Sequence, residues 1–190
     1  MQTTFDFSTL YAHPLISTVQ LEQIKAVHRQ VSFKKGDFIL QKGEISKSYF
    51  ALQIGIARSF VYDYDGNDIT TGFFCEQEFV INELSLFKQE PSLENIVALT
   101  DCTAWEVSFA DFQVLYHSIA GFSEWGRLFM TEKLFQTQRR FLEMITLPAK
   151  DRYLQFLKEK PQVLQNVALK HIATYLGITD TSLSRIRKEI

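Results

Sequence analysis

One stretch decides the fold of the end of this chain: VALKHIATYLGITDTSLSRIRKEI, residues 167–190. Four apolar residues recur at helical spacing and predict a helix with one apolar face: Leu169, Ile172, Ala173 and Leu176. Gly177 supplies the positive φ that ends a helix and opens a tight turn. Ile178 can fill the space between two helices, and Thr179 is a natural N-cap for the second. The stretch therefore predicts a helix-turn-helix, and the alternative is an ordinary helical hairpin in a core.

The second helix of this motif has two different sides. Leu183 and Ile186 are expected to face inward. The outward side is hydroxyl-rich and basic, as a groove-reading helix requires: Thr181, Ser182, Arg185 and Lys188. Residues 149–190 carry eight basic and four acidic side chains, whereas residues 1–148 carry 12 and 18. A basic end on an acidic body indicates a polyanionic partner, here double-stranded DNA.

The composition is that of a soluble protein with one or two domains. Hydrophobic residues make up 46% of the 190 residues and charged residues 22%. No apolar run approaches the roughly 20 residues of a membrane span, and no signal peptide opens the chain, so we expect a cytoplasmic protein without a membrane partner. Cys75 and Cys102 are too few for a disulfide framework, a metal set or an iron–sulfur cluster. Both are predicted to be small buried residues.

Short runs rich in Phe, Ile, Val and Tyr follow one another between residues 31 and 109, with Gly and Asp at the turns. The predicted strands are Val31–Phe33, Phe38–Gln41, Tyr49–Ile54, Ala57–Tyr62, Ile69–Phe74, Ile96–Ala98 and Thr103–Ser108. Asp65-Gly66 predicts a tight hairpin turn with positive φ at both residues. This pattern is typical of a sandwich or a jelly roll.

Helical patterns flank this β region. Residues 17–30 predict a helix capped by Ser17. After Phe109 a long stretch carries a wide apolar stripe that ends at Leu147-Pro148: Phe122, Trp125, Leu128, Phe129, Leu134, Phe135, Phe141, Leu142 and Ile145. One side of it can pack on the β domain and another on a second copy of the chain. A further helix is predicted over Asp151–Lys158.

The whole chain resembles the Crp/Fnr family of bacterial transcription regulators. The stretches that carry the resemblance are FKKGDFILQKGE (33–44), YFALQIGIAR (49–58), the long helix and the terminal helix-turn-helix. The resemblance implies an α+β fold: an N-terminal jelly roll (double-stranded β-helix) like cyclic-nucleotide-binding domains over 1–121, a dimerisation helix over 122–147, and an all-α helix-turn-helix domain over 148–190. It also implies a homodimer on a two-fold DNA site, with RNA polymerase as a further partner. The β-hairpin wing that follows in many relatives is absent from this sequence.

The resemblance also places a ligand site. Asn82-Glu83-Leu84 is similar to the family's Gly-Glu-Leu, so Glu83 takes the ribose-contacting place, and Ser85 follows in the same short helix. Ser92 or Leu93 stands where the family's phosphate-gripping Arg is expected, and no Arg lies between Arg58 and Arg127. Thr137 falls where the long helix lines the base pocket. The resemblance thus implies that the chain keeps the pocket of the family. We expect this pocket to bind a ligand other than cyclic AMP, or no ligand. Two alternatives remain: Glu83 can act as a helix cap or in a salt bridge, and Thr137 can be an interface residue.

The recognition helix departs from the family's best-known pattern, in which Arg and then Glu begin it. Asp180 and Thr181 take those places, and Asp180 is expected to cap the helix. Arg185 is a residue of the same type as the family has at its position, and it is the candidate for a bidentate guanine contact. Phosphate contacts are expected from the remaining polar side chains of the motif: Lys170, Thr179, Ser182 and Lys188.

Three classes of function compete. The main hypothesis is a ligand-responsive, dimeric transcription regulator. The second is a metal-dependent jelly-roll enzyme, which needs clustered His ligands, and residues 31–109 contain no His; we therefore expect no enzyme. The third is a cyclic-nucleotide sensor that acts on a protein partner and keeps a vestigial helix-turn-helix. His13, His28, His117 and His171 are scattered and predicted to be surface or capping residues rather than haem ligands.

Overall fold

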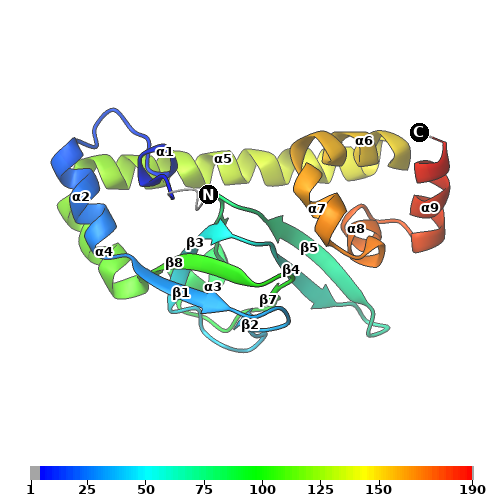
Figure 1. The fold of residues 1–190 in the computed structure, drawn as a ribbon, viewed down its shortest axis with the longest axis horizontal. Helices are drawn as coiled ribbons and strands as arrows, with labels where there is room; N and C mark the ends of the chain where they lie inside the picture. The colour runs from blue at the N-terminus through cyan, green and yellow to red at the C-terminus, as the bar shows by residue number, and fades with distance from the viewer. Residues whose placement is uncertain (1–4, 190) are drawn as a thin grey trace.

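Two antiparallel sheets of four strands pack face to face in the first half of the chain (Figure 1). The computed structural model describes residues 5–189. One sheet has the order β1-β8-β3-β6 and the other β2-β7-β4-β5. The strands are β1 (Arg29–Phe33), β2 (Phe38–Leu40), β3 (Ser48–Ile54), β4 (Ala57–Tyr62), β5 (Asp68–Phe74), β6 (Phe79–Val80), β7 (Asn95–Ala98) and β8 (Cys102–Ser108). The predicted sandwich is confirmed, and the two-residue β6 is the strand that the pattern missed.

Helices precede, interrupt and follow the sandwich. They are α1 (Phe7–Leu10), α2 (Thr18–Ala26), α3 (Glu83–Lys88), α4 (Phe109–Ser118), α5 (Ala120–Thr146), α6 (Ala149–Glu159), α7 (Pro161–Asn166), α8 (Leu169–Tyr175) and α9 (Asp180–Lys188). The 27 residues of α5 span about 40 Å. Figure 1 shows α5 running alongside the sandwich from α4 to the C-terminal helices. The α+β class predicted from the sequence is therefore confirmed.

The helix predicted over residues 17–30 is shorter than expected. Ser17 does cap it, in a capping box with Gln20, but α2 ends at Ala26. Arg29 and Gln30 instead belong to β1, where they pair with Glu106 and Trp105 of β8. Pairing with a neighbouring strand satisfies the backbone of these residues and overrides their helical pattern.

The turn predicted at Asp65-Gly66 is also different. Gly66 has a φ of +81°, but Asp65 does not have a positive φ. The Asp63 carboxylate accepts hydrogen bonds from the backbone N–H groups of Asp65 (2.9 Å) and Asn67 (2.8 Å). The connection between β4 and β5 is therefore a longer loop organised by an Asp side chain, of the kind that Asx turns form, rather than a two-residue turn.

The apolar stripe of α5 divides along the helix. Near its start Phe122 is fully buried, and Trp125 and Phe129 pack on the same core. Towards its end the large apolar residues are exposed, for example Phe135 at 56% and Ile145 at 66%. The sandwich covers only the first part of the helix, and this single chain leaves the second part uncovered.

The C-terminal helices pack against β5 of the same chain. Lys160 Nζ donates to the Glu78 carboxylate (2.6 Å) and to the Phe73 carbonyl (3.1 Å). The Thr174 hydroxyl accepts from Thr70 N–H (3.1 Å). Arg140 of α5 donates to the carbonyls of Thr71 and Tyr175 and lies over the Tyr175 ring. Arg140 thus joins α5, β5 and α8 at one point.

Burial of His28 generates a prediction about stability. Burial lowers the pKa of His28 to about 4, so the unfolded chain protonates it near pH 6.5 and the folded chain only near pH 4. We expect its neutral form to stabilise the fold fully above pH 6.5. This contribution, up to about 3 kcal/mol, is lost as pH falls from 6.5 to 4. Denaturant unfolding of wild type and His28→Gln at pH 7 and 4.5 measures it.

The control for this prediction is His117→Gln, which removes an exposed histidine. His117→Gln should lose as much stability between the two pH values as the wild type, and His28→Gln should lose less. An equal loss in all three proteins would contradict the prediction.

Candidate functional site

The ligand loop predicted from the sequence is built from β6, α3 and the segment that leads to β7. Asn82 is the N-cap of α3: its side-chain oxygen accepts from Ser85 N–H (2.9 Å), and its amide donates to the Glu94 carboxylate (3.2 Å). The Ser85 hydroxyl accepts from Ser46 N–H (2.9 Å) and donates to the Glu90 carbonyl (2.7 Å). Both side chains are buried and committed to holding the loop together.

The place of the missing Arg is occupied by two unlike residues. Ser92 is 1% exposed, and its hydroxyl donates to the Glu94 carbonyl (2.8 Å). Leu93 is 64% exposed at the rim of the loop. Between residues 79 and 99 the sequence has three carboxylates and one cation, Lys88. This loop therefore lacks the guanidinium fork that grips a cyclic phosphate, and its net charge is negative.

The structure brings together only some of the predicted ligand residues. Asn82, Ser85 and Ser92 meet around Glu94 and Glu90, while Glu83 is half-buried and Leu84 is 43% exposed on α3. Thr137 lies on the exposed half of α5, where its hydroxyl bonds the Lys133 carbonyl of its own helix (2.9 Å). The ligand role of these residues stays a prediction.

The helix-turn-helix has the geometry that the sequence predicts. Gly177 closes α8 with a φ of +66°, a backbone conformation that favours glycine. Thr179 is the N-cap of α9 and accepts from Ser182 N–H (3.2 Å). Leu183 is fully buried between the helices. Ile190, the last residue of the quoted stretch, lies outside the described residues.

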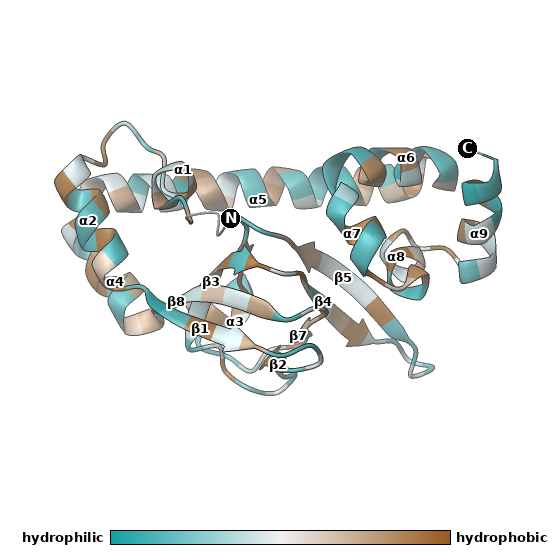
Figure 2. Cartoon of the chain, viewed as in Figure 1, coloured by the Kyte–Doolittle hydropathy of each residue, from teal (hydrophilic) through white to brown (hydrophobic). Residues whose placement is uncertain are grey.

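The outer face of α9 is polar and uncovered, and Figure 2 shows the helix as mostly hydrophilic. Thr181, Arg185 and Lys188 are exposed, Ser182 is half-buried beside the cap, and Asp180 begins the helix. Lys170 is exposed at the start of α8. The sequence analysis left out Arg187, which is also exposed on α9. The nine residues of α9 span about 13 Å, comparable to the width of a major groove.

The cysteines and histidines form no metal site. Within residues 5–189 no group of three or more His, Cys, Asp or Glu side chains could hold a metal ion. Cys75 and Cys102 are buried as predicted, and burial raises the pKa of Cys75 to about 11. The histidines were predicted to be surface or capping residues: His117 is exposed, and half-buried His28 contacts both the Ile24 carbonyl in the last turn of α2 and the Tyr11 hydroxyl. None of the helices over this range combines the length and apolarity that crossing a bilayer takes.

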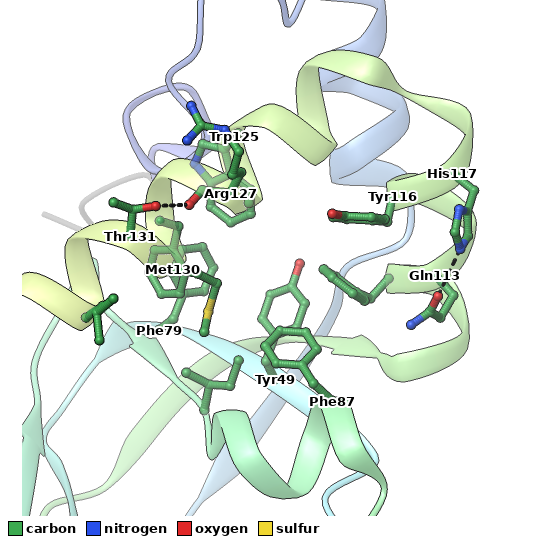
Figure 3. Close-up of a pocket in the computed structure, with 15 residues that line it drawn as sticks. Tyr49, Phe79, Phe87, Gln113, Tyr116, His117, Trp125, Arg127, Met130 and Thr131 are labelled. Carbon is green, nitrogen blue, oxygen red and sulfur yellow. Dashed lines mark hydrogen bonds between the residues drawn. The ribbon is translucent and has the colours of Figure 1, made fainter.

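A cavity that the sequence did not predict lies beside the loop. It has a volume of about 540 Å³ and lies between β3, α3, α4 and the first half of α5 (Figure 3). Its wall is largely aromatic, with residues from distant segments such as Tyr49, Phe87, Tyr116 and Trp125. No local pattern marks such a wall, because only the tertiary fold brings these residues together.

Comparison with known proteins shows which families share this fold. Residues 30–118 match the family model of the cyclic nucleotide-binding domain. FixK2 from Bradyrhizobium japonicum has a TM-score of 0.76 at 17% identity, covering 86% of this chain and 84% of that chain. The c-di-GMP responsive global regulator CLP from Xanthomonas campestris has a TM-score of 0.68 at 17% identity, covering 91% of each chain. A structure from Eubacterium rectale, described as a transcriptional regulator of the Crp/Fnr family, has a TM-score of 0.69 at 17% identity and covers 93% and 85%.

The sandwich therefore has the fold of a cyclic nucleotide-binding domain. Joined to α5 and the helix-turn-helix, it forms the fold of Crp/Fnr-type transcription regulators, which confirms the resemblance seen in the sequence. CLP and the Eubacterium rectale protein are both described as regulators. Identities of 17% show a shared fold, so ligand and partners must be argued from this chain's own residues. A search of curated proteins gives no significant match.

The chemistry of the loop predicts weak or absent binding of cyclic AMP, measured by calorimetric titration. Leu93→Arg should tighten binding about ten-fold, because the exposed rim can carry a guanidinium to the phosphate. Ser92→Arg is a poorer test, because Ser92 is buried. Val114→Arg, equally exposed on α4, is the matched control and should change nothing. A wild-type Kd in the low micromolar range would contradict this prediction.

Proposed function

We propose that this chain is a dimeric, DNA-binding transcription regulator of the Crp/Fnr type that senses a small ligand in its β-sandwich domain. The observation that carries the proposal is α9, which buries Leu183 and leaves Thr181, Arg185 and Lys188 open to solvent. A structural hairpin has no need of a basic, hydroxyl-rich outer face, whereas a helix that enters a major groove requires one.

Contacts to DNA are assigned by chemistry and position. Arg185 is our candidate for a bidentate contact to guanine, because a guanidinium matches the O6 and N7 acceptors. The prediction that Asp180 caps the helix is wrong: Thr179 is the N-cap, and Asp180 is the first residue inside α9, with Thr181 next to it on the exposed face. Phosphate contacts, which fix register rather than sequence, are assigned to Lys170, Thr179, Ser182 and Lys188. RNA polymerase, as a further partner, and a cytoplasmic location belong to the same proposal.

Dimerisation is assigned to the exposed second half of α5. Leu134, Phe135, Phe141, Leu142 and Ile145 are all more than half exposed there. A contiguous apolar face of this kind marks a protein interface. A parallel pair of α5 helices would place two copies of α9 on one two-fold DNA site.

The ligand domain is assigned a molecule other than cyclic AMP. Asn82, Glu83, Leu84, Ser85, Ser92, Leu93 and Thr137 remain our candidate contacts if the ligand occupies the loop. The Glu94 carboxylate accepts from the Asn82 amide, whereas Glu90 holds the loop through its backbone carbonyl. The loop carries the carboxylates of Glu83, Glu90 and Glu94, so an anionic ligand would meet repulsion. The ligand can change the affinity of the chain for DNA only if it binds two conformations of the chain with different affinities.

The dimer proposal predicts that Phe135→Asp yields a monomer. Phe135 is 56% exposed, so a carboxylate there costs the single chain little but would be buried in the interface. Light scattering at micromolar concentration should halve the mass relative to wild type. Phe129→Asp is not a clean test, because the Phe129 ring packs 5.2 Å from Phe79 in the core.

The matched control is Val19→Asp on α2, which puts the same charge at a site that is 71% exposed. It should leave the mass unchanged. A wild-type protein that is monomeric at micromolar concentration would refute the assignment.

The DNA proposal predicts different losses for two exposed cations. Arg185→Ala should weaken binding to the protein's selected site by about 1–3 kcal/mol and relax one base pair per half-site. Lys170→Ala should weaken all duplexes alike and lower the salt slope by about one unit. Binding of both variants to the selected site and to random duplex, at two salt concentrations, measures this.

The exposed Lys158 of α6 lies outside the helix-turn-helix, and Lys158→Ala is the control for loss of charge alone. Equal losses of specific and random binding in Arg185→Ala would make Arg185 a backbone contact. Absence of salt-dependent DNA binding would favour the alternative function, a sensor that acts on a protein partner.

A further inference from the structure

The cavity beside α5 has the size and lining of a small-molecule site. Its volume of about 540 Å³ lies within the range of ligand pockets. Phe79, Phe87 and Trp125 contribute much of its apolar wall. Three hydroxyl groups interrupt that wall: that of Thr131 donates to the Arg127 carbonyl of its own helix (2.8 Å), and Figure 3 shows those of Tyr49 and Tyr116 pointing into the cavity.

Behind Tyr49, three hydrogen bonds run in series into the core. Tyr49 Oη lies 2.9 Å from Tyr11 Oη, and Tyr11 Oη lies 2.9 Å from His28 Nε2. His28 Nδ1 lies 2.7 Å from the carbonyl oxygen of Ile24. We call this series of groups the tyrosine relay. It contains a single carbonyl, and that group fixes the direction of every bond in it.

The direction follows from what each atom can donate. A carbonyl oxygen only accepts, so His28 Nδ1 carries the proton of the neutral imidazole and Nε2 accepts. Tyr11 must then donate to His28, and Tyr49 must donate to Tyr11. Burial lowers the pKa of His28 to about 4, so the imidazole is neutral at pH 7. Tyr49 has used its only proton and offers the cavity nothing but lone pairs.

The charge of the lining adds a second constraint. Arg127 is the one Lys, Arg, Asp or Glu among the described residues that line the cavity, and its guanidinium forms two hydrogen bonds with Glu124 (2.8 and 2.6 Å). His117 and Gln113 also line the cavity, and His117 Nε2 lies 3.2 Å from Gln113 Oε1. The site therefore presents a largely aromatic wall in which the Arg127 guanidinium and the His117 ring each have a side-chain partner. Tyr116 is partly exposed and can donate or accept, so it does not set the polarity of the ligand.

We propose that this cavity binds a compact, uncharged aromatic or aliphatic molecule with one O–H or N–H group that donates a hydrogen bond to Tyr49 Oη. The buried acceptor makes the site selective, because a ligand without a donor would leave Tyr49 desolvated and unpaired. None of the predicted ligand residues 82–85, 92, 93 and 137 lines the cavity. The inference therefore does not rest on DNA binding or on the loop, and binding can be measured without DNA.

Two probes with the same ring system test the polarity. 1-Naphthol donates through its hydroxyl, whereas 1-methoxynaphthalene has an ether oxygen that can only accept. Calorimetry on the full chain should show saturable binding of one 1-naphthol per chain, about ten-fold tighter than that of the ether. Trp125 lines the cavity, so quenching of its fluorescence gives a second readout.

Three variants separate the hydroxyl from the ring. Tyr49→Phe keeps the ring and should weaken 1-naphthol about ten-fold, to the level of the ether. Tyr11→Phe frees the Tyr49 proton to point into the cavity, so Tyr49 can donate to the ether and the ratio of affinities should fall towards one. A merely structural role of Tyr11 would weaken both probes alike. Tyr62→Phe, on the exposed side of β4, is the control and should change neither probe.

Several outcomes would overturn the proposal. Equal affinity of wild type for the two probes would show that Tyr49 accepts no hydrogen bond from the ligand. Absence of saturable 1-naphthol binding would show that the cavity is not a binding site. Binding to the Phe135→Asp monomer but not to wild type would show that a second copy of the chain fills the space. Should Tyr11→Phe fail to fold by circular dichroism, Tyr49→Phe alone decides the question.

Discussion

The arrangement of this molecule depends on the aromatic contact between the start of α5 and the sandwich. Phe79 of β6 lies 5.5 Å from Trp125 and 5.2 Å from Phe129, ring centre to ring centre, and Trp125 Nε1 donates to the Leu10 carbonyl (3.2 Å). This contact holds only the first half of the helix and thereby sets its direction. It leaves the large apolar side chains of the second half exposed and forms one wall of the cavity.

A second contact fixes the far end of the helix. Arg140 donates to carbonyls of β5 and α8 and stacks 3.9 Å from the centre of the Tyr175 ring. With Lys160 on Glu78 and Thr174 on Thr70, it holds the C-terminal helices against the sandwich. These hydrogen bonds surround an apolar contact in which the Phe73 ring of β5 lies 5.8 Å from Phe156 and 5.2 Å from Tyr175, ring centre to ring centre. Aromatic rings therefore hold the start of α5, and the Arg140 hydrogen bonds hold its far end, which we call the polar end.

Local chemistry explains what the sequence could and could not predict. Gly177 and Thr179 act within a few residues, so the turn and the cap of α9 were predictable from their own stretch. The end of α2 was not predictable in this way, because Arg29 pairs with Glu106 of β8, which is 77 residues away in the sequence. Likewise, Phe129 and Phe135 look equivalent in the apolar stripe, and only the fold buries one and exposes the other. The tyrosine relay joins α1, α2 and β3, and no spacing rule connects those segments.

The order of features along α5 limits how a ligand could act. Trp125 and Leu134 line the cavity, Phe135 lies on the exposed face, and Arg140 holds α8, so cavity, proposed interface and polar contact lie close together on a single helix. Leu134 and Arg140 are about 9 Å apart along the axis, little more than one and a half turns. A ligand changes the polar end only if it binds differently to two positions of this helix. Leu134 itself lines the cavity, so a molecule in the cavity would contact the helix directly at that position.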